Sequence, residues 1–356
     1  ISTTVVVSLG DISKWRAKNF ETRLYREMFK SIGTELARNH TGLLDAMNAK
    51  GIKVPDYNEI DDEDKGREMV SDFFTAFNDL ISENAAFSRY NVVILLDEFT
   101  NIYIGLCKNK IDADFMKYWK AIINDFGLVA IVVGQDYMMD FVNAYPNPFG
   151  AIDKRPLSYL PLNEAERMIV RPPVSDESKR AVFDGPSGER AVKKILELTA
   201  GSAFFIMILM DRLIGYLNEV KQPYVTDADI DRLVADNLLS GHYSLDLAKF
   251  ESLYYDDGDV SDVSRPRHNV AVLWTISKQL HDFSRCRRSD ILISDKIASH
   301  SEMPKERVDE LLARLVARDV LNVDRDGNYT IKVGLFNEWL YHNCSVDTIN
   351  SIPDVK

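Results

Sequence analysis

Apolar residues recur along this chain as continuous runs and as helical stripes, and the runs predict β-strands. The run Val92–Leu96 holds five consecutive aliphatic residues and ends in Asp97 and Glu98. Leu128–Val133 is a second aliphatic run, and Thr3–Leu9 is rich in β-branched residues. Runs without polar alternation are typical of parallel strands that helices cover on both faces. We therefore expect three parallel strands, with the central one buried.

Stripes with helical spacing separate these runs. They predict helices over Lys14–Asn39, Glu68–Asn84 and Asp112–Phe126, and the stretch His40–Lys65 is expected to be a surface loop with one short helix. A β-α-β-α-β succession predicts a parallel sheet with right-handed crossovers. A further short strand is expected near Leu157–Leu160.

The pattern is helical after this sheet. Helices are predicted over Asn163–Ile169, Ser187–Thr199 and Ser202–Asn218, followed by a short helix capped by Thr226. Residues 246–266 are expected to form an exposed linker between the preceding helices and the C-terminal part.

The last part of the chain has a pattern of its own, three helices followed by a β-hairpin and a closing helix. This order is typical of a winged helix. The predicted elements are Val270–Leu280, Ser289–Ala298, Pro304–Arg318, the strands Val320–Val323 and Tyr329–Val333, and Leu335–His342.

Length and composition favour a soluble protein of several domains. At 356 residues the chain predicts two or three domains, and 46% hydrophobic residues suffice for their cores. The longest apolar run, Ala203–Met210, is far shorter than the roughly 20 residues that span a bilayer. Cys107, Cys286 and Cys344 are scattered, which argues against a disulfide framework or a zinc site. We expect a cytoplasmic protein with no membrane contact.

The charge is acidic and unevenly placed. The net charge of −12 argues against non-specific nucleic-acid binding by the whole chain, because phosphate contacts need clustered Lys and Arg. Residues 266–345 carry nearly balanced charge, and Arg285, Arg287 and Arg288 form the one dense basic cluster there. The chain starts at Ile1 and enters a strand at once, so we expect it to be a fragment of a longer protein.

Asp97 and Glu98 are the candidate chemistry, and two interpretations fit them. They are either a polar stop after a core strand, or a Walker B pair in which Asp97 holds Mg²⁺ and Glu98 orients the attacking water. Ligands of open α/β sheets bind at the carboxyl ends of strands, where this pair is predicted to lie.

With Gln135 following the next strand, the chain resembles P-loop ATPases of the AAA-like STAND group, of the archaeal type with a C-terminal winged helix. The resemblance covers most of the chain. Asp97 and Glu98 match the Walker B pair, and Gln135 matches the polar sensor. Leu198–Ser202, with Gly201, resembles the Gly-turn of the family's helical lid, and Leu312–Leu340 its winged helix, which ends in a Phe-x-x-Trp-Leu helix.

The resemblance implies a division of the chain and roles for its residues. Residues 1–160 would be an α/β core, 161–245 the lid, 246–265 a linker, 266–345 the winged helix and 346–356 a tail. Glu98, Gln135 and Arg155 would be catalytic, Asp97 and Gly201 would contact ATP, and Asp97 would hold Mg²⁺. Arg155 also fits a solvated lead-in to a strand, and Gln135 an ordinary turn.

The chain departs from the family's pattern in two places. No Gly-x-x-x-x-Gly-Lys-Ser/Thr loop occurs in it, and Ser202-Ala203 stands where relatives often carry a Pro. That loop supplies most phosphate binding, and in this family its strand lies between the Gln135 strand and the short strand near Leu157. We therefore expect a truncated core in which the first strand and the loop are missing, and no bound ATP on this chain alone.

The functional prediction is an ATP-binding and ATP-hydrolysing regulatory switch in signal transduction, active in the longer protein and inactive in this fragment. Self-association or a protein partner is expected. The alternative is a non-catalytic winged-helix regulator that binds a protein, or DNA through Arg285, Arg287 and Arg288.

Overall fold

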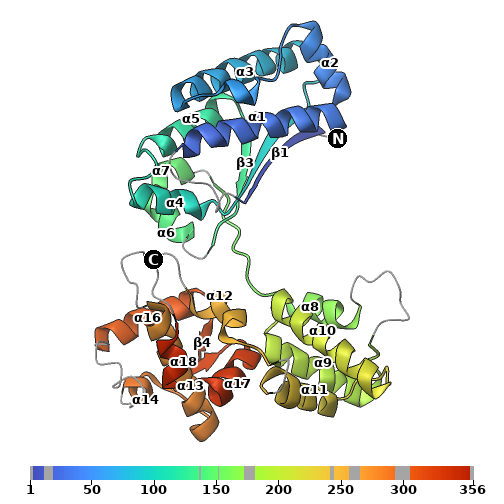
Figure 1. Ribbon diagram of the computed structural model, residues 1–356, viewed down its shortest axis with the longest axis vertical. Coiled ribbons are helices and arrows are strands. Elements are labelled where there is room, and N and C mark those ends of the chain that lie inside the picture. Colours follow the sequence, from blue (N-terminus) through green and yellow to red (C-terminus); the bar gives the residue numbers. More distant parts are fainter. Residues whose placement is uncertain are drawn as a thin grey trace. The chain divides into compact units, whose positions relative to one another are not determined.

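The computed structural model describes residues 3–11, 19–135, 138–150, 152–171, 181–240, 244–255, 265–292 and 305–352. The chain is a mixed α/β protein of two compact units, Ile1–Asp153 (unit 1) and Lys154–Lys356 (unit 2) (Figure 1). Each unit has its own hydrophobic core.

Unit 1 alternates strands and helices, as the pattern predicts. Its elements are β1 (Thr3–Asp11), α1 (Phe20–Asn39), α2 (Thr41–Ala49), the 3₁₀ turn η1 (Tyr57–Glu59), α3 (Glu63–Glu83), β2 (Tyr90–Asp97), α4 (Thr100–Cys107), α5 (Phe115–Asp125), β3 (Val129–Val132), α6 (Met138–Ala144) and α7 (Pro146–Phe149).

The three strands form one parallel sheet in the order β1-β2-β3, so the predicted parallel pairing is confirmed. In its register Val6 pairs with Val93, and Val93 with Val129. One face of the sheet is buried: Val5, Val7 and Ile94 are at most 1% exposed. Helices α1, α3 and α5 lie along this covered side (Figure 1).

The prediction that β2 is covered on both faces is wrong. Its residues alternate between buried and half-exposed, and on the adjacent β3 Val129 and Ile131 are 47% and 51% exposed. The reason lies in the topology. Two successive right-handed crossovers that step in the same direction put their helices on the same side of the sheet. Helices on the opposite side would require the strand order to reverse.

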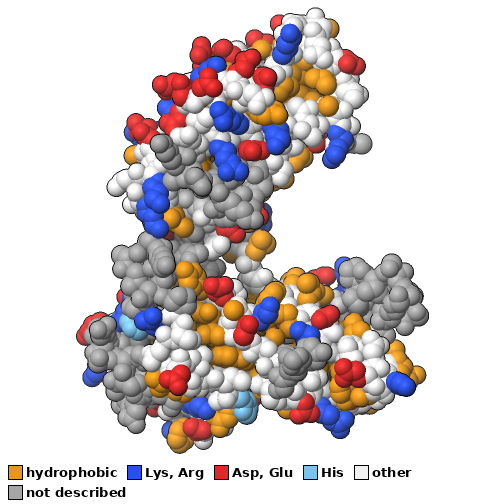
Figure 2. Space-filling view, viewed as in Figure 1, with side chains coloured by type: hydrophobic (Ala, Val, Ile, Leu, Met, Phe, Trp, Pro, Cys, Tyr) orange, Lys and Arg blue, Asp and Glu red, His pale blue; other side chains and the backbone are white. Residues whose placement is uncertain are grey.

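One predicted boundary of unit 1 changes, since α3 begins at Glu63, with Asp62 as its cap, and not at Glu68. The short helix expected within His40–Lys65 is α2, nine residues long, which buries Leu43 and Met47. The expected helix start at Lys14 lies outside the described residues. The exposed side of α3 is strongly acidic, and Figure 2 shows these carboxylates gathered over it.

Unit 2 is helical apart from one hairpin. Its elements are α8 (Leu162–Val170), α9 (Gly185–Thr199), α10 (Ala203–Val220), α11 (Asp227–Leu233), the π-helical turn η3 (Val234–Leu238), the 3₁₀ turn η4 (Leu247–Phe250), α12 (Glu251–Tyr254), α13 (Arg265–Phe283), α14 (Arg288–Leu292), α16 (Lys305–Ala317), β4 (Leu321–Val323), β5 (Tyr329–Ile331), α17 (Gly334–Asn343) and α18 (Val346–Asn350).

The predicted strand near Leu157–Leu160 is wrong, because residues 152–161 have no regular secondary structure. Pro156 and Pro161 lack the N–H that a ladder needs, and Leu157 is 90% exposed.

The prediction that residues 246–266 form an exposed linker is wrong for residues 246–255, and residues 256–264 lie outside the described residues. Phe250 is fully buried and stacks on Phe205 of α10 and on Phe336 of α17. This segment therefore joins the helices that precede it to the C-terminal elements in one core.

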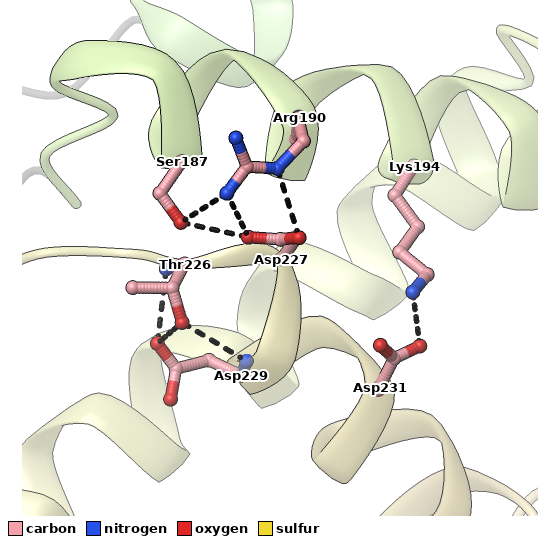
Figure 3. A network of polar contacts seen from close by, with 7 residues as sticks. All are labelled: Ser187, Arg190, Lys194, Thr226, Asp227, Asp229 and Asp231. Carbon is pink, nitrogen blue, oxygen red and sulfur yellow. Dashed lines mark hydrogen bonds and ion pairs between the residues drawn. The ribbon is translucent and has the colours of Figure 1, made fainter.

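A polar network fixes α11 against α9 (Figure 3). Asp227 accepts hydrogen bonds from Ser187 at 2.7 Å and from Arg190 at 3.0 Å, and these bonds hold the pKa of its carboxyl well below the usual range. Thr226 and Asp229 form a capping box, which confirms Thr226 as the cap.

The last elements follow the predicted order of helices and hairpin. β4 and β5 pair antiparallel, and a single antiparallel bridge joins Arg287, between α13 and α14, to Asn328 beside β5. The second half of the predicted helix Ser289–Ala298 lies outside the described residues.

Candidate functional site: a carboxylate edge

The carboxylate edge is formed by Asp97, Glu98 and Gln135 where β2 and β3 end. Two backbone hydrogen bonds continue the pairing past β3. The Val133 N–H donates to the Leu96 carbonyl at 2.8 Å, and the Phe99 N–H donates to the Val133 carbonyl at 2.7 Å. The two chain segments therefore leave the sheet side by side.

The structure brings Glu98 and Gln135 into direct contact, although they are 37 residues apart. The Gln135 side-chain N–H donates to Glu98 Oε2 at 2.9 Å. Gln135 is exposed and Glu98 half-buried, so the contact lies at the surface of the edge.

The backbone at Glu98 is in the left-handed region, with φ of 57°. This conformation is unfavourable for a residue with a Cβ, and such residues cluster at functional sites. The Glu98 N–H donates to Asp97 Oδ1 at 2.9 Å, and the Glu98 carbonyl accepts from the Asn101 N–H and from Asn101 Nδ2. These three hydrogen bonds hold the turn.

Two further residues, Thr100 and Gly134, support the turn, and neither was predicted from the sequence. Thr100 is fully buried, and its hydroxyl accepts a long 3.4 Å hydrogen bond from the Gln135 N–H. Gly134 leaves room for this contact, because a Cβ there would lie 2.6 Å from Thr100 Cγ2. The signal available in the sequence was a hydroxyl residue shortly after one strand and a glycine after its neighbour.

The edge offers the donors that a hard cation prefers. Asp97 presents an exposed carboxylate, and Mg²⁺ is commonly held by one or two carboxylates together with water and phosphate oxygens. Among the described residues no group of three or more His, Cys, Asp or Glu could hold a metal by itself. The donor set thus fits a cation shared with a phosphate ligand.

The other two predicted site residues belong to unit 2. Arg155 is exposed, in the segment before α8. Gly201 has φ of 79° in the turn between α9 and α10, and its carbonyl accepts from the Leu160 N–H at 2.9 Å. The structure gives Gly201 a conformational role in the turn, and the carboxylate edge belongs to unit 1.

The arginine cluster is exposed, but two of its members have partners. Arg288 makes a two-pronged ion pair with Asp309 of α16, with 2.6 Å between Nη2 and Oδ2. Arg287 donates to Asn328 Oδ1 at 3.4 Å. Cluster charge is therefore partly neutralised by α16.

No helix in the described ranges is long and apolar enough to cross a lipid bilayer. The three cysteines are free thiols: Cys107 is exposed, while burial raises the pKa of the Cys286 and Cys344 thiols to about 12.

Comparison with known proteins gives a likeness of fold. No protein-family model matches the sequence, and no curated protein matches it either. Among solved structures the chain resembles the ORC2 protein of Aeropyrum pernix, whose structure is described as ADPNP–ADP complexes. The TM-score is 0.56 at 10% sequence identity, over 98% of this chain and 78% of that one.

This likeness supports a P-loop-ATPase-like fold for the chain. At 10% identity it carries no residue roles, and it does not distinguish the STAND group from other ATPases of this fold.

Proposed function

We propose that this chain is part of a STAND-like, AAA-related ATPase switch, in which the carboxylate edge is the half of the nucleotide site that supports Mg²⁺ and water. The observation that carries this proposal is the 2.9 Å contact between Gln135 and Glu98 at the carboxyl ends of adjacent parallel strands, with Asp97 immediately before Glu98.

Each residue has a role in this proposal. Asp97 holds Mg²⁺, which when bound neutralises charge on the phosphates. Glu98 accepts a proton from a water molecule and orients that water toward the γ-phosphate. Gln135 fixes the Glu98 carboxylate by its hydrogen bond and is placed to sense the γ-phosphate.

The proposal requires a phosphate-binding loop, and the sequence contains no Gly-x-x-x-x-Gly-Lys-Ser/Thr motif. We propose that the loop and its strand come from sequence outside them and pair with β3. Support comes from the sheet, where β3 is an edge strand among the described residues and its exposed side chains are apolar. A strand added there would reverse the strand order and allow helices on the open face.

We propose that α13, α14, α16 and the β4–β5 hairpin form a winged helix, since they follow its order and Arg287 bridges to the hairpin. Its expected role is regulatory packing. DNA binding is the second candidate, supported by exposed Arg285, Arg287 and Arg288 and opposed by the Arg288–Asp309 pair.

The test uses isothermal titration with Mg-ATP on this chain and on a longer protein that contains a phosphate-binding loop. We expect no micromolar binding to the 356 residues and clear binding to the longer protein. In the longer protein Glu98→Gln should abolish hydrolysis and keep ATP binding, because only the water-orienting carboxylate is lost. Micromolar binding to the short chain, or unchanged hydrolysis by Glu98→Gln, would contradict the proposal.

DNA binding is tested by filter binding at low salt. If the arginine cluster contacts phosphates, changing Arg285, Arg287 and Arg288 to Glu should remove the binding. If DNA binding is weak and unaffected by these changes, the cluster does not contact phosphates and the result favours regulatory packing as the role of the winged helix.

A further inference from the structure

The segment that leads into α8 is held by two parts of unit 2 that are remote from it in sequence. We call residues 154–161 the connector. Its first residues are exposed, whereas Tyr159 and Leu160 pack against the core of unit 2.

Asp319, between α16 and β4, binds the connector on one side. The Ser158 hydroxyl donates to Asp319 Oδ2 at 2.5 Å, across 161 residues of sequence. Lys332, just after β5, donates to the same oxygen at 2.6 Å. The Lys332 ammonium also lies 4.4 Å from the ring centroid of Tyr159, which is a cation–π distance.

The backbone favours this arrangement. Asp319 has φ of 62°, and Asp is among the residues that tolerate the left-handed region best. Burial raises the pKa of Asp319, but the bonds from Lys332 and Ser158 outweigh it and leave the pKa below its usual value. Asp319 is therefore a carboxylate at neutral pH, which suits both donors.

The turn at Gly201 holds the connector by its backbone. The Leu160 N–H donates to the Gly201 carbonyl at 2.9 Å. The two backbone segments lie so close together that a Cβ on Gly201 would lie 2.8 Å from the Leu160 carbonyl oxygen. The connector thus touches both the α9–α10 turn and the α16–hairpin region.

The residue before Asp319 extends this junction. The Arg318 guanidinium donates to the Ser252 carbonyl at 2.9 Å and to the Tyr255 carbonyl at 2.7 Å. The end of α16 therefore binds α12 through Arg318 and the connector through Asp319.

We propose that Ser158, Tyr159, Asp319 and Lys332 form a latch through which the α16–hairpin region controls how freely the connector moves. Loss of the Lys332 contacts to Asp319 and Tyr159 would open the latch and release the connector. The inference does not depend on nucleotide binding, because none of these residues belongs to the carboxylate edge.

The test is hydrogen–deuterium exchange of the connector in the full chain, measured for Lys332→Met and Asp319→Asn. Met keeps the length of the side chain without its charge, and Asn keeps the left-handed backbone conformation. Each variant should speed exchange of the Leu160 amide, which donates to the Gly201 carbonyl, about three- to tenfold, the effect of losing one charge-assisted interaction. Ser158→Ala, at an exposed position, should give a smaller increase and leaves the core untouched.

Asp227→Asn is the matched control, since it removes a carboxylate from a polar network of unit 2 that does not touch the connector. It should leave connector exchange unchanged. The proposal is overturned if connector exchange is unaffected by Lys332→Met, Asp319→Asn and Ser158→Ala, or if these three speed exchange equally throughout unit 2.

Discussion

At the scale of single residues, unit 1 holds a buried carboxylate, Glu21, in an ion pair with the partly exposed Arg67. Glu21, in the first turn of α1, is 2% exposed, and Arg67 of α3 donates to both of its carboxylate oxygens at 2.7 and 2.9 Å. The guanidinium also lies 4.8 Å from the ring centroid of Tyr118 on α5. Three helices therefore meet at one charged group.

We expect Arg67→Met to destabilise unit 1 by about 3–5 kcal/mol, because it leaves a buried carboxylate without its counter-charge. Urea unfolding at pH 7.5 would measure the loss. The control is Lys50→Met, whose ion pair with Glu83 is exposed and whose removal should not change the unfolding midpoint. Equal losses of stability in Arg67→Met and Lys50→Met would contradict the prediction that the buried Glu21 carboxylate needs its counter-charge.

The same variant has a predicted pH dependence. Burial raises the pKa of Glu21 and Arg67 opposes the rise, so the pKa should be higher still in Arg67→Met. The destabilisation is full above this folded-state pKa and fades as pH falls below it, because the protonated acid is then favoured in the folded state. The stability gap to the unchanged protein should therefore narrow between pH 7.5 and pH 4.

At position 98 the left-handed backbone favours glycine, whereas the proposed chemistry requires a carboxylate side chain. With φ of 57°, the position favours glycine, so Glu98→Gly should be about 1 kcal/mol more stable than Glu98→Ala in thermal unfolding. Both variants lose the contact to Gln135, so their difference isolates the backbone. If the Ala variant is the more stable, as is usual at other positions, Glu98 is not strained.

At the scale of elements, the sequence pattern identified the long helices well because each buries a regular stripe. The buried residues of α1 and α3, including Leu24, Met28, Phe73 and Phe77, recur with helical spacing. The sheet pairing also followed from the pattern, since β-α-β connections admit few topologies.

The short elements did not follow from it. Helices α4, α6, α7 and α12 span four to eight residues, too few to show a period, and Phe250 is buried by helices far away in the sequence. The pair Asp97 and Glu98 was predicted from the strand that precedes it. Thr100 and Gly134 were not, because their roles come from a contact between two loops.

The turn between α9 and α10 is predicted to tolerate only glycine. Gly201→Ala should destabilise unit 2 by about 1–3 kcal/mol, because φ is 79° and the new Cβ would meet the Leu160 carbonyl. Gly215→Ala, in the middle of α10 with open space around it, should instead stabilise by about 0.5–1 kcal/mol. Thermal unfolding of both variants checks the prediction, and a loss at both positions would contradict it.

At the scale of the whole molecule, the two cores differ in how completely they are covered. Unit 2 surrounds its core with helices from both halves of its sequence. Unit 1 presents a sheet with one covered face. On the edge strand β3 and directly after it, Val129, Ile131 and Val133 are 45% to 51% exposed. An apolar edge strand of this kind is a site for pairing with another chain.

We therefore predict that the 356-residue protein self-associates through β3. Sedimentation velocity should show a concentration-dependent shift to larger species, and Ile131→Lys should abolish it, because a charge on an edge strand opposes pairing. Met207→Lys is the control, since Met207 is 60% exposed on α10 and lies outside the sheet. A longer protein that supplies a strand beside β3 should behave like Ile131→Lys, because the edge is then occupied. Association that survives Ile131→Lys but not Met207→Lys would move the interface to unit 2 and show that the open sheet face is not what drives pairing.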